Sequence, residues 1–175
     1  MPVFFDIETQ NTFQEVGGRY PERLRLSVAV TYNSADAAFH HYTEQNVAAL
    51  VAELAAADLV VGYNLYGFDY PVLQRYTQTV ELAKLPTVDM MQVLERRLGH
   101  RIGLDAVATA TLKIGKSADG LQAVQWWREG RLAELFQYCE QDVEVTRQLY
   151  EFGKTYRYVA YYDRQRKLQR VPVTW

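Results

Sequence analysis

The sequence is poor in the residues that build disulfide frameworks and thiolate metal sites. Cys139 is the only cysteine among 175 residues, which excludes a disulfide framework and a cysteine-based zinc site. No apolar run approaches the roughly 18 residues of a membrane-spanning helix. The chain opens with no charged-then-apolar leader, and it has no low-complexity stretch or internal repeat. We therefore expect one globular domain over residues 1–175, with no membrane contact and a cytoplasmic location.

The formal charge of −2 conceals an uneven distribution along the chain. Residues 156–175 carry five basic side chains against one acidic side chain, a net charge of +4, which leaves −6 for residues 1–155. This division fits an enzyme that holds metal ions in a carboxylate pocket and meets a polyanion near its edge, although an ordinary solvated surface has the same composition. The last segment has two β-rich arms around DRQRK, which predicts a basic C-terminal hairpin beside a core of residues 1–155.

Hydrophobic periodicity predicts an α/β chain with a mixed β-sheet flanked by helices. Strands are expected at residues 3–9, 24–32, 38–42, 58–64 and 86–88. Helices are expected after Thr43 through Leu54, at 70–78, 89–98 and 103–112, and from Gly120 to Tyr156 with a break at Gly130. Three strands come first, and strands then alternate with helices. This order is typical of a layered α/β fold, and we expect its first strand at the centre of the sheet.

Two carboxylates interrupt the first expected strand, VFFDIET at residues 3–9. Its other residues are the apolar and β-branched types that form a buried strand. Asp6 and Glu8 are two positions apart, so both side chains project from the same face, roughly 6–7 Å apart along the chain. Two like charges on a half-buried face require a positive partner, and a divalent cation is one such partner. The rest of the chain must then supply further ligands.

The expected helix over residues 131–152 supplies another acid on its inward side. At about 100° per residue, Tyr138 and Asp142 fall on the shoulder of the apolar arc, whereas Glu140 and Glu144 point outward. Tyr138 lies four residues before Asp142, so both side chains reach one site. For this helix alone, a surface helix whose tyrosine packs at the edge of the core is the simpler interpretation.

The segment VGYNLYGFDYPVL, residues 61–73, places polar residues where a strand passes into a helix. Asn64 follows the apolar end of the strand, and Asp69 precedes Pro71 at the start of a helix. Each has an ordinary structural interpretation, Asn64 as a turn residue and Asp69 as an N-cap. Open α/β folds hold ligands at such junctions, which favours a shared site.

Taken in order, three motifs resemble those of the DEDD family of 3′→5′ exonucleases, in the tyrosine subgroup. The motifs are Asp6-Ile7-Glu8, the stretch from Asn64 through Phe68 to Asp69, and Tyr138 four residues before Asp142. In the histidine subgroup a histidine stands five residues before the last aspartate, where this chain has Gln137. The segment YNLYGFDYPVL, residues 63–73, is especially similar to the proofreading domains of family B DNA polymerases. Stand-alone and helicase-associated ribonuclease H-like exonucleases are similar too.

This resemblance implies a ribonuclease H-like fold and a hydrolase that shortens single-stranded DNA or RNA from the 3′ end. It implies two divalent metal ions, Mg²⁺ or Mn²⁺, bridged by Asp6 and suited to hard oxygen ligands. Glu8 and Asp142 would complete one metal site, and Asp69 would reach the second directly or through water. Tyr138 would orient the attacking water. Its phenol, with an ordinary pKa of about 10, is a poor general base at neutral pH.

The resemblance also implies substrate contacts from three residues: Thr9, Asn64 and Phe68. Phe68 as an ordinary core residue fits the sequence nearly as well. The natural partner is a nucleic-acid 3′ end, and a helicase or a polymerase is a further class of partner. The sequence does not distinguish DNA from RNA.

Two other functions are compatible with the same residues. One is a non-catalytic nucleic-acid-binding or protein-binding module that keeps the fold without the chemistry, and the presence of all four acids and the tyrosine argues against it. The other is a structure-specific endonuclease, which would differ by cutting circular or 3′-blocked substrates.

Overall fold

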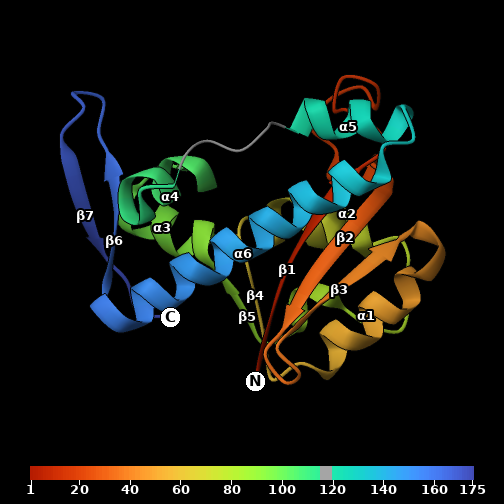
Figure 1. Cartoon of the computed structure of the whole chain (residues 1–175), viewed down its shortest axis with the longest axis horizontal. Coiled ribbons are helices and arrows are strands. Elements are labelled where there is room, and N and C mark those ends of the chain that lie inside the picture. Colours follow the sequence, from red (N-terminus) through yellow and green to blue (C-terminus); the bar gives the residue numbers. More distant parts are fainter. Residues whose placement is uncertain (115–119) are drawn as a thin grey trace.

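A five-stranded mixed sheet forms the centre of the computed structural model, which describes residues 1–114 and 120–175 (Figure 1). Its strands are β1 (Pro2–Thr9), β2 (Leu26–Asn33), β3 (Ala38–Thr43), β4 (Leu59–Gly62) and β5 (Thr87–Asp89). The order is β3-β2-β1-β4-β5, with β1 antiparallel to β2 and parallel to β4. The expectation of a mixed sheet with the first strand at its centre is confirmed.

Helices cover both faces of the sheet. They are α1 (Val47–Ala56), α2 (Tyr70–Gln74), α3 (Met90–Leu98), α4 (Leu104–Leu112), α5 (Gly120–Arg128) and α6 (Leu132–Tyr156). On one face Phe4 packs in a core with residues of α6 such as Val143. On the other face Phe5 packs with Leu50 of α1 and Leu73 of α2. In the part of the chain that the structure describes, no helix is both long and apolar enough to cross a bilayer.

Strand β1 divides its side chains between the two cores, and this division positions the acids. Val3, Phe5 and Ile7 belong to the core on the α1 side, whereas Phe4 belongs to the core under α6. Asp6 and Glu8 continue the alternation of Phe4, so they project on the side of α6. The pairing of β1 with β2 shifts in register between Ile7 and Thr9, and such irregularities often re-aim a side chain beside a functional site.

The connection from β4 to α2 differs from the expected turn and helix. Asn64 has a left-handed backbone with φ of 70°, and the π-helical turn η3 (Leu65–Asp69) follows it. The N–H of Tyr70 donates to the carbonyl of Leu65, five residues earlier. Pro71 has no N–H to continue a regular ladder, which favours such a local adjustment. Helix α2 then ends at Gln74 rather than near residue 78.

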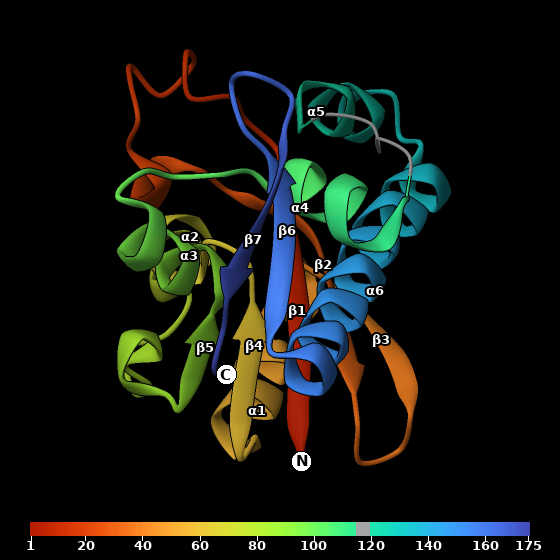
Figure 2. The ribbon, with the colours of Figure 1, turned by 90° about the vertical axis from the view of Figure 1, so that its left-hand side faces the viewer.

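The expected C-terminal hairpin is present as β6 (Tyr158–Tyr162) and β7 (Leu168–Pro172) (Figure 2). Ala160 exchanges two hydrogen bonds with Thr111 Oγ1 of α4, at 3.1 and 2.8 Å. Trp175 donates from Nε1 to the carbonyl of Tyr150, and its indole stacks on that ring. A Cβ at Gly153 would lie 2.4 Å from the indole, so only glycine permits this contact. The hairpin is therefore fixed to both α4 and α6.

Candidate active site

Three carboxylates converge at the junction of β1 and α6. Asp6 and Glu8 come from β1 and Asp142 from α6, and one oxygen of each lies within 4.8 Å of the other two. Glu140, two residues before Asp142, instead meets the exposed His41 at 2.8 Å. The helical phase predicted from the sequence, with Asp142 inward and Glu140 outward, is confirmed.

Burial and mutual repulsion disfavour full ionisation of this cluster. Burial raises the pKa of Asp6 well above its usual value, and the neighbouring Asp142 raises it further. The pKa of Glu8 is raised first by burial and then by Asp6, Asp142 and Asp69. A divalent cation would allow all three acids to ionise, and carboxylate oxygens are the ligands that Mg²⁺ and Mn²⁺ prefer. The donor set therefore fits a divalent metal.

Asp69 lies beside this cluster without belonging to the group of three. It stands at the N-cap position of α2, but its backbone is helical and its side chain makes no capping hydrogen bond, so it does not act as a cap. The side chain is buried, and Oδ1 has no hydrogen-bond partner among the described residues. Burial and then the charge of Asp6 raise its pKa. A buried oxygen without a partner costs about 1–3 kcal/mol, which a cation ligand would offset.

Tyr138 stands one helical turn before Asp142 and faces the acids. Its ring packs edge-on against Trp126 of α5, with the ring centroids 5.9 Å apart. Partial burial raises the pKa of the phenol, and the charges of Asp142, Glu8 and Asp6 raise it further. The hydroxyl therefore stays protonated at neutral pH and acts as a hydrogen-bond donor or acceptor, not as a full base.

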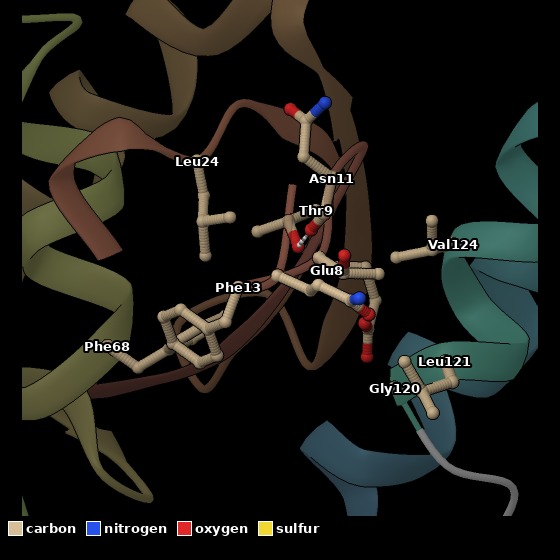
Figure 3. A pocket seen from close by; sticks show the side chains of 11 residues that line it. Glu8, Thr9, Asn11, Phe13, Leu24, Phe68, Gly120, Leu121 and Val124 are labelled. Carbon is tan, nitrogen blue, oxygen red and sulfur yellow. Dashed lines mark hydrogen bonds between the residues drawn. The ribbon is translucent and has the colours of Figure 1, made fainter. Parts of the chain in front are cut away.

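A pocket of about 500 Å³ adjoins the acids at Glu8 (Figure 3). Phe13 and Phe68 stand on one side of Glu8, and Leu121 and Val124 of α5 stand on the other. The rings of Phe13 and Phe68 meet edge to face, 5.9 Å apart. The pocket also includes Thr9, whose hydroxyl donates to the carbonyl of Asn11 at 2.9 Å. Two of the three residues that the sequence assigned to substrate, Thr9 and Phe68, thus line one cavity with a carboxylate of the cluster.

The third predicted contact, Asn64, lies outside the lining of this pocket. Its side-chain Oδ1 accepts a hydrogen bond of 2.7 Å from Nη2 of Arg101. A Cβ at Gly67 would lie 2.4 Å from that same Oδ1, so the glycine leaves room for the amide. The substrate role of Asn64 stays a prediction.

Residues 3–152 match the model of the RNase_H superfamily. The chain belongs to this superfamily. Among solved structures, the family B DNA polymerase from the hyperthermophilic archaeon Pyrobaculum calidifontis is similar, with a TM-score of 0.66 and 20% identity. The match covers 87% of this chain and 24% of the polymerase chain, so the chain spans about a quarter of that protein's length. At this identity the likeness shows the fold alone. No curated protein matches the chain.

As a ribonuclease H-like protein, the chain has a mixed sheet, flanking helices and an added C-terminal hairpin on a nuclease-type fold.

Two residues that support the acids lie outside the residues that the sequence motifs identified. The first is Cys139, whose buried thiol donates to the backbone carbonyl of Asp6 at 3.3 Å and lies 3.7 Å from its Oδ2. Burial and then the charge of Asp6 raise the pKa of this thiol, so it stays protonated. Cys139 thereby ties α6 to β1 at the position of Asp6.

The second is Asp89, at the end of β5, which fixes the turn that leads to Asp69. Its carboxylate accepts from the backbone N–H groups of Asn64 at 2.8 Å and Tyr66 at 3.1 Å. It also caps α3 by accepting from the N–H of Gln92 at 3.2 Å. The sequence signal was an aspartate between a short strand and a helix, which reads as an ordinary N-cap. Its second role, across to the neighbouring strand, follows only from the parallel pairing of Gly62 with Asp89.

Proposed function

We propose that this member of the RNase_H superfamily is a metal-dependent 3′→5′ exonuclease acting on single-stranded DNA or RNA. The observation that carries the proposal is the convergence of Asp6, Glu8 and Asp142 within 4.8 Å, at a pocket that includes Glu8 itself. Similarity of the fold to a DNA polymerase chain supports a nucleic-acid substrate. The agreement of all three sequence motifs with the exonuclease pattern supports the direction of attack.

The acids fit two divalent ions, Mg²⁺ or Mn²⁺. Asp6 would hold both ions, Glu8 and Asp142 would complete one site, and the unpartnered Oδ1 of Asp69 would serve the other. Bound ions of this kind supply an activated water and neutralise the charge of the reacting phosphate. Cys139 and Asp89 contribute indirectly, because one holds the strand of Asp6 and the other holds the turn before Asp69.

The pocket suits one terminal nucleotide. Its volume of about 500 Å³ lies in the range for small-molecule ligands. Phe13 and Phe68 offer aromatic surface to a base, which is a sequence-tolerant contact. A base enters only after it leaves a partner strand, so single strands and frayed ends are the expected substrates. Tyr138, protonated and one helical turn before Asp142, would orient the attacking water by a hydrogen bond.

Digestion of 5′-labelled single-stranded DNA and RNA in Mg²⁺, in Mn²⁺ and in EDTA tests the proposal. We expect a ladder that shortens by single nucleotides from the 3′ end and that disappears in EDTA. Asp142→Asn should nearly abolish the ladder, whereas Glu140→Gln, on the outward face of the same helix, should leave it intact. Internal fragments, or cleavage of circular DNA, would instead indicate an endonuclease. Binding without any metal-dependent hydrolysis would indicate a non-catalytic module.

A further inference from the structure

The tip of the β6–β7 hairpin concentrates exposed positive charge. Asp163 organises the turn, because its carboxylate accepts from the backbone N–H groups of Gln165 at 2.8 Å and Lys167 at 3.0 Å. Arg164, Arg166 and Lys167 are exposed. Within the described parts of the chain, none of these three basic side chains forms an ion pair. Their charge is therefore available to a polyanion.

Exposed apolar surface lies directly beside this charge. Tyr162 and Leu168 are cross-strand partners at the tip, and their exposed fractions are 48% and 47%. Directly opposed residues in a hairpin project from the same face, so the two side chains form one patch. The ammonium of Lys113, at the end of α4, lies 5.8 Å from the centroid of the Tyr162 ring. An aromatic ring among basic side chains is the arrangement that proteins use to bind single-stranded nucleic acids.

Two cavities extend from this patch along α4. A cavity of about 460 Å³ between α4 and the hairpin is lined by Asp105, Ala106 and Tyr162, among others. A second cavity, of about 540 Å³, shares Ala106 and Tyr162 and extends to Arg164. On its other side α4 packs against α6, the helix that carries Tyr138 and Asp142. Figures 1 and 2 place the hairpin tip at the same end of the molecule as α5, which borders the pocket.

We propose that α4 and the hairpin tip form a second binding surface for the single strand, holding nucleotides on the 5′ side of the one that is removed. The substrate class rests on the proposed function. Tyr162 stacks on a base, and Lys113, Arg164 and Lys167 bind phosphates. The surface is preformed, because Thr111 and Trp175 fix the hairpin to α4 and α6. Preorganisation of this kind lowers the entropic cost of ordering a flexible strand.

Cleavage of a length series tests this surface. The substrates are single strands from a dinucleotide to about 30 nucleotides, and kcat/KM is measured for each. Wild-type kcat/KM should rise with length and then level off. Tyr162→Ala should lower kcat/KM on long strands by about 5- to 150-fold, which corresponds to the loss of one stacked base. It should leave the dinucleotide unaffected, and Tyr162→Phe should behave as wild type.

A charge variant and a matched control measure the electrostatic contribution of the hairpin tip to binding of the strand. Arg164→Ala/Lys167→Ala removes two positive charges at the tip, and the left-handed backbone of Arg166, with φ of 59°, is left untouched. Lys84→Ala/Lys154→Ala removes two charges from exposed positions outside both cavities. The tip variant should reduce the slope of log affinity against log salt by about 1.4, from two lost phosphate contacts. The control should keep the wild-type slope. Circular dichroism melts establish that each variant is folded.

The outcomes separate this surface from the proposed function. The tip variants are Tyr162→Ala and Arg164→Ala/Lys167→Ala. If they still produce the ladder and their kcat/KM rises with strand length as in wild type, the exonuclease is supported and the second binding surface is refuted. An equal loss of kcat/KM on dinucleotides and long strands also refutes it, because the hairpin would then act at the cleavage site itself. If the wild-type protein cleaves none of the substrates, the proposed function fails. Binding of a 30-nucleotide strand, measured by fluorescence anisotropy, then tests the second binding surface. Weaker binding by the tip variants alone supports it, and equal binding by all variants refutes it.

Discussion

Removing the charge of Glu8 should make the metal-free protein more stable while abolishing its proposed activity. Glu8→Gln keeps the shape of the side chain and takes one charge out of the cluster with Asp6 and Asp142. The four largest influences on the pKa of Glu8, burial and three neighbouring acids, all raise it. The ionised form is therefore disfavoured in the folded protein, and a neutral amide relieves that cost.

The size of the effect follows from the spacing of the oxygens. Two charges 4.8 Å apart repel by about 3.5 kcal/mol at an effective dielectric constant of about 20. Partial protonation of the cluster limits how much of this repulsion the folded protein bears, so we expect a gain of about 2 kcal/mol. For a chain of this length, that gain corresponds to a rise in Tm of about 4–8 °C in EDTA at pH 7.

The gain should depend on pH in a defined direction. Below the ordinary glutamate pKa of 4.5, Glu8 is protonated in both the folded and the unfolded chain, so the two proteins should be equally stable. As pH rises through 4.5, the unfolded chain ionises first, and the wild type loses stability relative to Glu8→Gln. The difference in Tm should therefore be absent near pH 4 and largest at neutral pH.

Thermal melts of wild type, Glu8→Gln and the matched Glu140→Gln provide the assay, in EDTA and in Mg²⁺ or Mn²⁺. Metal at about 100 times its Kd should stabilise wild type by about 2.7 kcal/mol, and Glu8→Gln by less, so that the order of stability reverses. A Glu8→Gln protein no more stable in EDTA than Glu140→Gln would refute the reasoning. So would an equal response of both variants to metal.

Three other perturbations test separate parts of the site and fold. Tyr138→Phe should keep metal affinity and lower the single-turnover rate by about 10²-fold, because it loses the hydroxyl that we propose orients the attacking water; a wild-type rate would reduce Tyr138 to a packing role. Asp89→Ala leaves the N–H groups of Asn64 and Tyr66 without their acceptor, so it should lower the free energy of unfolding by about 3 kcal/mol and weaken metal binding. Urea denaturation and calorimetry measure the two effects, and an unchanged metal affinity would show that the turn does not position Asp69. Glu44 lies in the turn before α1, and a hydrogen bond from Arg25 helps to hold the pKa of its carboxyl at about 2. Glu44→Gln should therefore lower the free energy of unfolding by about 1–2 kcal/mol at pH 7. This stabilisation is complete above pH 4.5 and is lost as pH falls through 2, so equal urea midpoints at pH 7 would contradict it.

Strong local patterns made much of the fold predictable. The buried run of β1 with two same-face acids identified both the central strand and part of the cluster. The apolar arc of α6 predicted that Asp142 points inward and Glu140 outward. Periodicity describes the direction of a side chain and carries no information about what lies opposite.

The connection from β4 to α2 shows what local patterns cannot reveal. A π-helical turn has no residue signature of its own, so Asp69 resembled an N-cap ahead of Pro71. The role of Asp89 required knowing that β5 lies beside β4, which is a non-local fact. The link from Cys139 to Asp6 likewise joins residues 133 positions apart. Such contacts emerge only from the assembled sheet.

The distance along the chain between β1 and α6 has a consequence for folding. The strand with Asp6 and Glu8 lies at the start of the sequence, and the helix with Cys139 and Asp142 lies near its end, yet they share one site. Such a contact closes a long loop and forms late, because its entropic cost is met only when the layers between have assembled. Any partly folded form in which α6 is undocked lacks Asp142 at the site, so its set of acidic ligands is incomplete. The proposed hydrolysis would therefore report only the fully assembled structure, whereas circular dichroism would also detect secondary structure in partly folded forms.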